Sequence, residues 1–90
     1  MELIFDKNAE NLYEVEFEAS SDFNIHVERN TVGYFAVMQR TTTSGKFDIT
    51  LNLGNNGREC IDCDFSGVVY PKTIKVVSSV PVISGEVTFV

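Results

Sequence analysis

The sequence predicts an all-β protein, a small antiparallel β-sandwich of immunoglobulin-like type with about seven to eight short strands and no helix. Residues 12–19 and 23–29 alternate apolar and polar side chains with a period of two, which is typical of half-buried strands. Further short segments with β-pattern follow, and residues that favour turns separate them. No window shows the 3.6-residue period of an amphipathic helix over about ten residues or more.

Length and composition agree with one such domain. The chain has 90 residues, so we expect a single domain that spans residues 1–90. Apolar residues make up 43 % of the sequence and aromatic residues 11 %, which is enough for a packed core and argues against disorder.

The charge excludes several classes of partner. Thirteen acidic residues stand against seven basic ones, the net charge is −6, and no run of Lys or Arg occurs. We therefore expect no nucleic-acid binding and no attraction to an anionic membrane surface. The apolar runs are too short to span a membrane, and no signal peptide is visible at the start. Synthesis in the cytoplasm is expected, with a trimmed secreted form as the alternative.

The first half of the chain predicts a hairpin. Residues 3–5 are expected to form a short strand before a loop over residues 6–11. The segments 12–19 and 23–29 are then expected to pair around a three-residue loop. Only that loop length places Ala19 against Phe23, Phe17 against Ile25 and Val15 against Val27 on one face, with Glu16 opposite His26 on the wet face, because a slip of one residue would turn every side chain over.

The middle of the chain predicts a second hairpin. Residues 34–40 carry apolar groups on both faces and suit a central strand. The segments 46–53 and 61–65 are expected to pair around Asn55-Asn56-Gly57, with Gly57 in the left-handed conformation. This register sets Leu51 against Ile61, Ile49 against Cys63 and Phe47 against Phe65, so that Cys63 points into the core and Cys60 points outward.

The last third of the chain predicts three or four more short strands. Residues 68–70 come before Pro71, which interrupts a ladder, and residues 73–78 form the next strand. Pro81 marks an edge or a kink, and residues 82–84 and 86–90 end the chain in β-pattern.

Two groups of residues are candidates for metal sites. The second hairpin would bring Asp48, Asp62 and Asp64 together on its wet face, as a candidate for Ca²⁺, although a solvated acidic face is the simpler interpretation. Cys60 and Cys63 form half of a zinc motif, but residues three apart on a strand face opposite sides. We therefore expect two reduced thiols, no bound metal and no cofactor.

No catalytic set is visible. Glu14, Glu16 and Glu18 form an acidic stripe on an exposed strand, without the cleft that a glycosidase requires. His26 would need a nucleophile in reach, and Gly54-x-x-Gly57 lacks the Lys-Ser/Thr of a phosphate-binding loop. The sequence therefore predicts a protein that is not an enzyme.

Two sets of residues are candidates for a partner interface. Tyr13, Tyr34 and Tyr70 offer rings that can stack on sugars or on a protein, although half-buried caps of the core are the alternative. The final segment, Glu86, Val87, Thr88, Phe89 and Val90, offers an open strand edge that can pair with a neighbouring sheet.

Several motifs, in their order along the chain, resemble a family of small virion-associated proteins of tailed bacteriophages of gut Bacteroidales, including crAss-like phages. The motifs lie at residues 16–19, 22–29, 37–41, 44–48 and 64–65, and at Val82 with Glu86-Val87-Thr88. The most specific block is Val69-Tyr70-Pro71-Lys72-Thr73-Ile74-Lys75-Val76-Val77-Ser78. The match covers most of the chain.

The resemblance implies a structural protein of the virion, in particular a head auxiliary (decoration) protein bound to the capsid shell. Its partners would be the major capsid protein or other virion proteins, in many copies set by the particle symmetry. The protein would be made in the bacterial host cytoplasm and would reside in the virion. The alternative is a β-sandwich binding module for a glycan or a bacterial surface protein.

Overall fold

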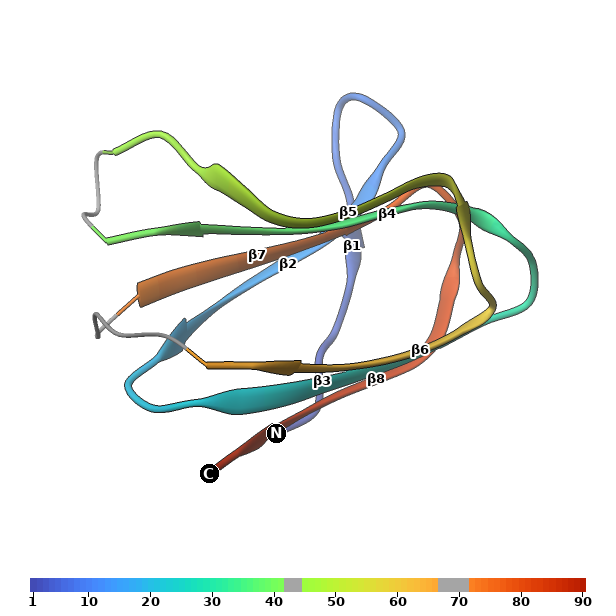
Figure 1. The fold of residues 1–90 in the computed structure, drawn as a ribbon. Coiled ribbons are helices and arrows are strands. Elements are labelled where there is room, and N and C mark those ends of the chain that lie inside the picture. The colour runs from blue at the N-terminus through green and yellow to red at the C-terminus, as the bar shows by residue number, and fades with distance from the viewer. Residues whose placement is uncertain (42–44, 67–71) are drawn as a thin grey trace.

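Two antiparallel sheets lie face to face in the computed structural model, which describes residues 1–41, 45–66 and 72–90 (Figure 1). The five-stranded sheet has the order β1 (Asp6–Lys7), β2 (Tyr13–Ala19), β7 (Lys72–Ser78), β4 (Gly33–Arg40) and β5 (Asp48–Gly57). The three-stranded sheet has the order β6 (Cys60–Phe65), β3 (Phe23–Arg29) and β8 (Val82–Phe89). The predicted all-β sandwich is confirmed. Its strand order, given above, differs from the predicted pairing of neighbouring strands. Nothing in the described ranges is helical, so no helix there could cross a membrane.

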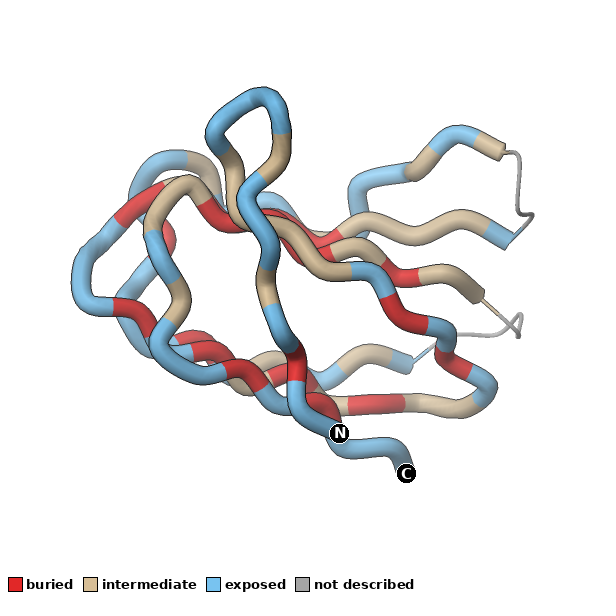
Figure 2. The backbone as a smooth tube through the Cα atoms, turned by 180° about the vertical axis from the view of Figure 1, so that it is seen from behind, coloured by how far each residue is buried: buried red, intermediate tan, exposed pale blue. Residues whose placement is uncertain are grey.

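The core lies between the sheets, and the buried residues, red in Figure 2, come from strands of both layers. The predicted alternation holds in β2 and β3: Phe17 and Ala19 are buried on one strand, and every second residue from Phe23 is buried on the other. Burying these side chains supplies the main favourable term in folding. The buried cluster comprises Leu3, Phe17, Ala19, Phe23, Ile25, Val27, Phe35, Val37, Ile61, Ile74, Val76 and Val87.

Aromatic rings fill one end of the sandwich, where β3 begins. The Phe23 ring stacks on Phe65 with centroids 5.2 Å apart, and it meets Phe17 of the opposite sheet edge-on at 5.5 Å. Phe89 completes the group at 6.2 Å from Phe17. Edge-to-face and offset contacts at these distances are the favoured geometries for aromatic pairs. This cluster joins the two layers where β2 passes into β3.

A buried arginine joins the layers where β3 ends. The Arg29 side chain is 3 % exposed, and one guanidinium nitrogen donates to the Tyr34 carbonyl at 3.0 Å and the Ser78 hydroxyl at 3.1 Å. Its other terminal nitrogen donates to the carbonyls of Gly33 at 3.3 Å and Arg58 at 2.6 Å. One side chain of the small sheet thereby binds two strands of the large sheet and the β5–β6 connection.

The predicted pairing of the first hairpin is wrong. β2 pairs with β1 and β7 in the large sheet, whereas β3 pairs with β6 and β8 in the small sheet. Residues 20–22 therefore carry the chain from one layer to the other (Figure 1). The apolar faces still meet, because Phe17 and Phe23 face each other across the core instead of lying side by side. Glu16 and His26 consequently lie in different sheets.

The predicted pairing of the second hairpin is also wrong. β5 pairs with β4 in the large sheet, and β6 pairs with β3 in the small sheet. The expected turn residues Asn55-Asn56-Gly57 belong to β5, and the crossing occurs at residues 58–59. The predicted facings of Cys60, which is exposed, and Cys63, which packs against the core, are confirmed.

Bulges in the β4–β5 ladder explain why β5 does not alternate as predicted. The register shifts between Val37 and Met38, so that Leu51 is opposite inward-facing Val37 while Ile49 is opposite Met38. Leu51 alone of the four expected inward residues packs against the core. Ile49 is 58 % exposed and Leu53 37 % exposed, and Phe47 packs against Arg40 instead.

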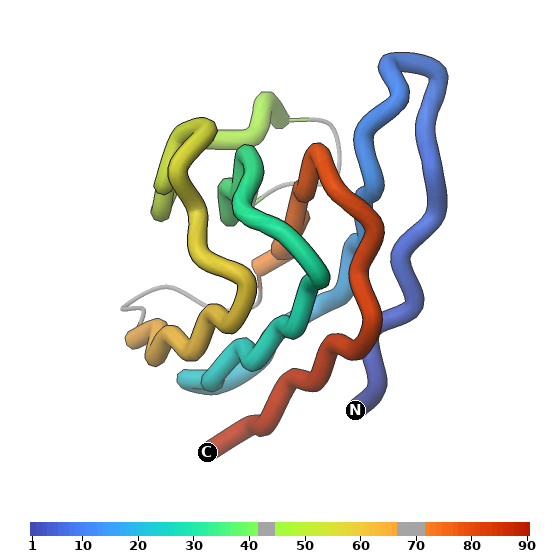
Figure 3. Tube along the Cα trace, turned by 90° about the vertical axis from the view of Figure 1, so that its right-hand side faces the viewer, coloured from blue at the N-terminus to red at the C-terminus, as the bar shows by residue number. Residues whose placement is uncertain are grey.

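The start of the chain lies beside the last strand (Figure 3). The amide of Leu3 donates to the Gly85 carbonyl at 2.8 Å, and the amide of Val87 donates to the Met1 carbonyl at 2.8 Å. The expected first strand at residues 3–5 is displaced to Asp6–Lys7, which pairs with β2. The strand expected at residues 68–70 lies outside the described residues.

Candidate functional site

The outer face of the three-stranded sheet gathers most of the side chains with possible chemistry. Cross-strand register sets them in three rows, each with one residue from β6, β3 and β8. We call this surface the polar face, and its rows are Asp64–Asn24–Thr88, Asp62–His26–Glu86 and Cys60–Glu28–Ser84. These residues point outward because their neighbours on each strand are the alternate residues that fill the core.

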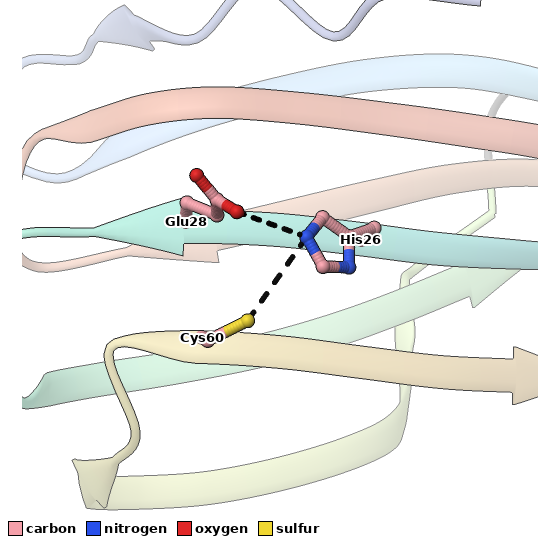
Figure 4. Close-up of side chains that lie close together, drawn as sticks. All are labelled: His26, Glu28 and Cys60. Carbon is pink, nitrogen blue, oxygen red and sulfur yellow. Dashed lines mark hydrogen bonds and ion pairs between the residues drawn. The ribbon is translucent and has the colours of Figure 1, made fainter.

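His26 lies at the centre of the polar face and contacts Asp62, Glu28 and Cys60, and Figure 4 draws the last two of these contacts. Its Nδ1 atom is 3.3 Å from Asp62 Oδ2, and its Nε2 atom is 3.3 Å from Glu28 Oε1. The Nε2 atom also lies 4.0 Å from the sulfur of Cys60. The ring therefore has a carboxylate at each nitrogen and a thiol beside one of them.

The groups around His26 are themselves held by neighbours. Asn24 Nδ2 donates to Asp62 Oδ1 at 2.7 Å and to Asp64 Oδ1 at 2.9 Å. The Ser84 hydroxyl donates to Glu28 Oε2 at 3.4 Å. Each carboxylate that contacts the imidazole thus has its second oxygen engaged elsewhere, which limits its rotation.

Hydrogen bonding shifts the acid–base equilibria of this network. The bonds to Glu28 and then Asp62 raise the pKa of His26, since both carboxylates favour the imidazolium. The bonds from Asn24 and then His26 lower the pKa of Asp62. On the inner side of the same strand, burial raises the pKa of the Cys63 thiol.

The arrangement of Cys60, His26 and Asp62 follows the order of a nucleophile, a base and an orienting carboxylate. A general base needs a free lone pair on the nitrogen that faces the nucleophile. Here that nitrogen faces the Glu28 carboxylate, which favours a positive charge between the two atoms, either a proton or a bound cation, over a lone pair directed at Cys60. The surface is a sheet face, and three of the hollows on the described residues are lined by none of these three side chains. The geometry suits ligands for a cation better than a nucleophilic pair.

The structure does not bring the three predicted calcium ligands together. Asp62 and Asp64 lie on the polar face, but Asp48 lies on β5 at the edge of the other sheet. Within the described ranges, the group that meets the spacing for metal ligands is His26, Glu28 and Cys60. Sequence reasoning missed this group because it depends on the β3–β6 pairing, although the outward facing of Cys60 was available.

Two of the predicted interface tyrosines are half-buried, and the third, Tyr70, lies outside the described residues. Tyr13 lies under Lys7, whose Nζ is 5.8 Å from the ring centroid. Tyr34 lines a hollow of about 440 Å³ on the outer face of the large sheet, beneath the loop that precedes β2. An ion pair between Lys75 and Glu14 at 3.1 Å borders the same hollow.

The predicted strand edge at residues 86–90 is covered in part. Glu2 bridges to Glu86, and the amide of Val87 donates to Met1, so the N-terminal segment occupies the edge at these residues. Thr88, Phe89 and Val90 are exposed beyond that segment. A more open edge lies on β5, the last strand of the large sheet.

Comparisons with known protein families, characterised proteins and solved structures find no match to this chain.

Proposed function

We propose that this protein is a structural component of a phage virion, an auxiliary (decoration) protein that binds the capsid shell. The sequence resemblance suggests the class, and the structure supplies a scaffold suited to it: two packed sheets with a rigid core. A protein repeated over a shell needs no active site, only a surface that complements its neighbour. The observation that carries the proposal is the outer edge of β5, along which no strand of the described residues pairs.

The β5 edge has the features of a docking surface. β5 is ten residues long and ends the sheet, and β4 is its strand partner within the described residues. Solvent-facing Ile49 and Leu53 lie along it. Natural proteins usually cover or charge such an edge, because its unpaired backbone groups can pair with another chain. The bulges give partial protection, and the rest of the edge suits the addition of a partner strand.

Charge distribution favours the same edge. From Ile49 to Gly57 the sequence has no charged residue, although charged residues make up 22 % of the chain. Depletion of charge is typical of the buried centre of a protein–protein interface. The major capsid protein is the partner that the resemblance indicates, and the β5 edge is where we place the contact.

Mass spectrometry of purified virions tests the role itself. The protein is expected among the particle proteins in many copies, at a fixed ratio to the major capsid protein. Its absence from washed particles would refute the proposal.

A binding assay tests the β5 edge. Particles that lack the protein are mixed with the purified chain, and bound protein is measured after sedimentation. Ile49→Lys is expected to lower the bound fraction at least about ten-fold, since it places a charge in an apolar contact. Ile83→Lys is a matched control, because Ile83 is 60 % exposed on β8. Equal binding by both variants would move the contact away from β5.

The hollow beside Tyr34 favours a second candidate, a binding module for a glycan. Apolar Leu12 and Met38 line it together with the ring of Tyr34 and the Glu14–Lys75 ion pair. Rings with nearby polar groups are the usual elements of sugar recognition. A glycan array probed with the wild-type chain and Tyr34→Ala tests it: binding lost in the variant supports this function, and no binding by the wild type removes it.

A further inference from the structure

We infer that His26, Glu28 and Cys60 form a binding site for Zn²⁺ or a similar divalent transition metal on the polar face. The three ligand atoms, His26 Nε2, Glu28 Oε1 and Cys60 Sγ, lie within 4.8 Å of one another (Figure 4). This inference is independent of the proposed virion role, since it rests on the geometry of three side chains.

The distances between the ligand atoms fit a tetrahedral zinc ion. Zinc–nitrogen and zinc–oxygen bonds of about 2.1 Å at the tetrahedral angle place the two atoms about 3.4 Å apart. The observed His26–Glu28 distance is 3.3 Å. A zinc–sulfur bond of about 2.3 Å places sulfur about 3.6 Å from the histidine nitrogen. The observed 4.0 Å, and a Glu28–Cys60 separation of up to 4.8 Å, require the exposed Cys60 side chain to move toward the other two ligands.

The backbone presents the ligands without rearrangement. His26 and Glu28 are two apart on β3, so their side chains leave the same face of the sheet. Cys60 is directly opposite Glu28 on β6. β3 is the central strand of the three-stranded sheet and is hydrogen-bonded to β6 and β8, which fixes the spacing of His26 and Glu28.

Neighbouring side chains form hydrogen bonds with the ring nitrogen of His26 and the carboxylate oxygen of Glu28 that would not bind the metal. Asp62 Oδ2 contacts Nδ1 of His26 and favours the tautomer that leaves Nε2 free to bind a metal. A carboxylate in this position is the usual outer-shell partner of a zinc-bound histidine. Asn24 holds the other oxygen of Asp62, and Ser84 holds Oε2 of Glu28, which leaves Oε1 toward the metal.

The chemistry of the ligands selects the metal. A thiolate and an imidazole suit Zn²⁺ and other borderline or soft ions, whereas Ca²⁺ requires six to eight oxygens. Three protein ligands leave a fourth tetrahedral position, which a water molecule fills in sites of this kind. The expected composition is therefore one cysteine, one histidine, one glutamate and one water.

Titration of the purified full chain with Co²⁺ tests the site, because tetrahedral cobalt bound to a thiolate absorbs in the near ultraviolet and the visible. The expected result is one Co²⁺ per chain with a sulfur-to-cobalt charge-transfer band, displaced by Zn²⁺. Cys60→Ser is expected to abolish the band, and His26→Gln to weaken metal binding by more than ten-fold. No band in the wild-type chain would overturn the inference.

Two further variants distinguish specific binding of Zn²⁺ at this site from attraction of the ion to an acidic surface. Asp62→Asn is expected to lower Zn²⁺ affinity about 10- to 100-fold, as loss of an outer-shell partner does. Asp64→Asn removes a carboxylate from the same face that has no ligand role, and it should bind Zn²⁺ as the wild type does.

Zn²⁺ is also expected to raise the melting temperature of the wild type but not of Cys60→Ser. Equal Zn²⁺ affinity in Cys60→Ser and the wild type would mean that the carboxylates alone attract the ion, and would refute the site. Melting curves without metal confirm that each variant folds.

Discussion

Arg29 is a buried cation whose partners are neutral. Its guanidinium donates to three backbone carbonyls and one hydroxyl, from Gly33, Tyr34, Arg58 and Ser78. Burial lowers the pKa of Arg29, because the charged form loses its hydration. The face of Phe35 adds a cation–π contact, with the guanidinium carbon 5.3 Å from the ring centroid. The side chain therefore donates to oxygens of β4, β7 and the β5–β6 connection.

Replacing Arg29 by Met is expected to lower the free energy of unfolding by about 3 kcal/mol, since it removes four hydrogen bonds that join β4, β7 and the β5–β6 connection. Urea denaturation followed by circular dichroism measures the change. Arg58→Met is the matched control, because the Arg58 side chain is exposed and only its backbone oxygen takes part. A loss no larger than in the control would show that the guanidinium contributes little.

His26 gives stability a dependence on pH. Its hydrogen bonds to Glu28 and Asp62 favour the imidazolium in the folded protein, so its pKa is raised above the ordinary value of 6.5, while Glu86 faces it from β8. The contribution is fully present below that unfolded value and is lost as the pH rises through the folded pKa. With a chelator present, the melting temperature of the wild type relative to His26→Gln is expected to fall between about pH 6 and pH 8. A constant difference across that range would contradict the assignment.

At the scale of strands, the sequence predicted which face each residue occupies better than which strand lies beside it. Alternation in β2 and β3 is a property of each strand alone, so the facings of Phe17, Ile25 and Val27 followed from it. Pairing depends on where the connecting loop leads. A three-residue loop can close a hairpin or cross between sheets, and both choices bury the same residues. The alternation alone therefore does not distinguish a hairpin from a crossing between sheets.

β5 departed from its predicted facing because of local backbone geometry. Gly54 has a φ of +60°, a conformation that other residues adopt at a cost, and it lies where the ladder with β4 shifts register. The prediction that Gly57 is left-handed is wrong, and the Gly-Asn-Asn-Gly run does not make the predicted turn. In the structure it forms a bulged strand, which is the other common use of a left-handed residue in a sheet.

Two glycines of β5 are expected to respond differently to alanine. A Cβ on Gly57 would lie 2.6 Å from the Gly33 carbonyl oxygen and 2.9 Å from Arg29 Nη2, so Gly57→Ala should cost roughly 2 to 3 kcal/mol of stability. Gly54 has open space around it, and Gly54→Ala should cost about 1 kcal/mol for the left-handed backbone alone. Chemical denaturation of both variants checks the order, and an equal loss would refute the steric explanation.

At the scale of the molecule, the sequence predicted a two-layer all-β sandwich, but neither which strands share a sheet nor the candidate site. The candidate metal ligands come from β3 and β6, which are separated by two strands of the opposite sheet. No spacing rule links His26 to Cys60, so the cluster was visible only after the sheets were assembled. The sequence alone did predict three features: the acidic surroundings, the outward facing of Cys60 and the absence of a phosphate-binding loop.

The position of β7 determines when the protein can finish folding. β7 is the seventh strand in the chain but the central strand of the large sheet, between β2 and β4. Until residues 72–78 arrive, the hairpins β1–β2 and β4–β5 have no strand to join them, and β3 still lacks β8. A chain emerging from a ribosome therefore cannot close either layer until its last quarter is released. Stopped-flow refolding is expected to take milliseconds to seconds, as for other sandwiches built from distant strands. Microsecond folding would mean that a local nucleus, and not this late central strand, sets the pace.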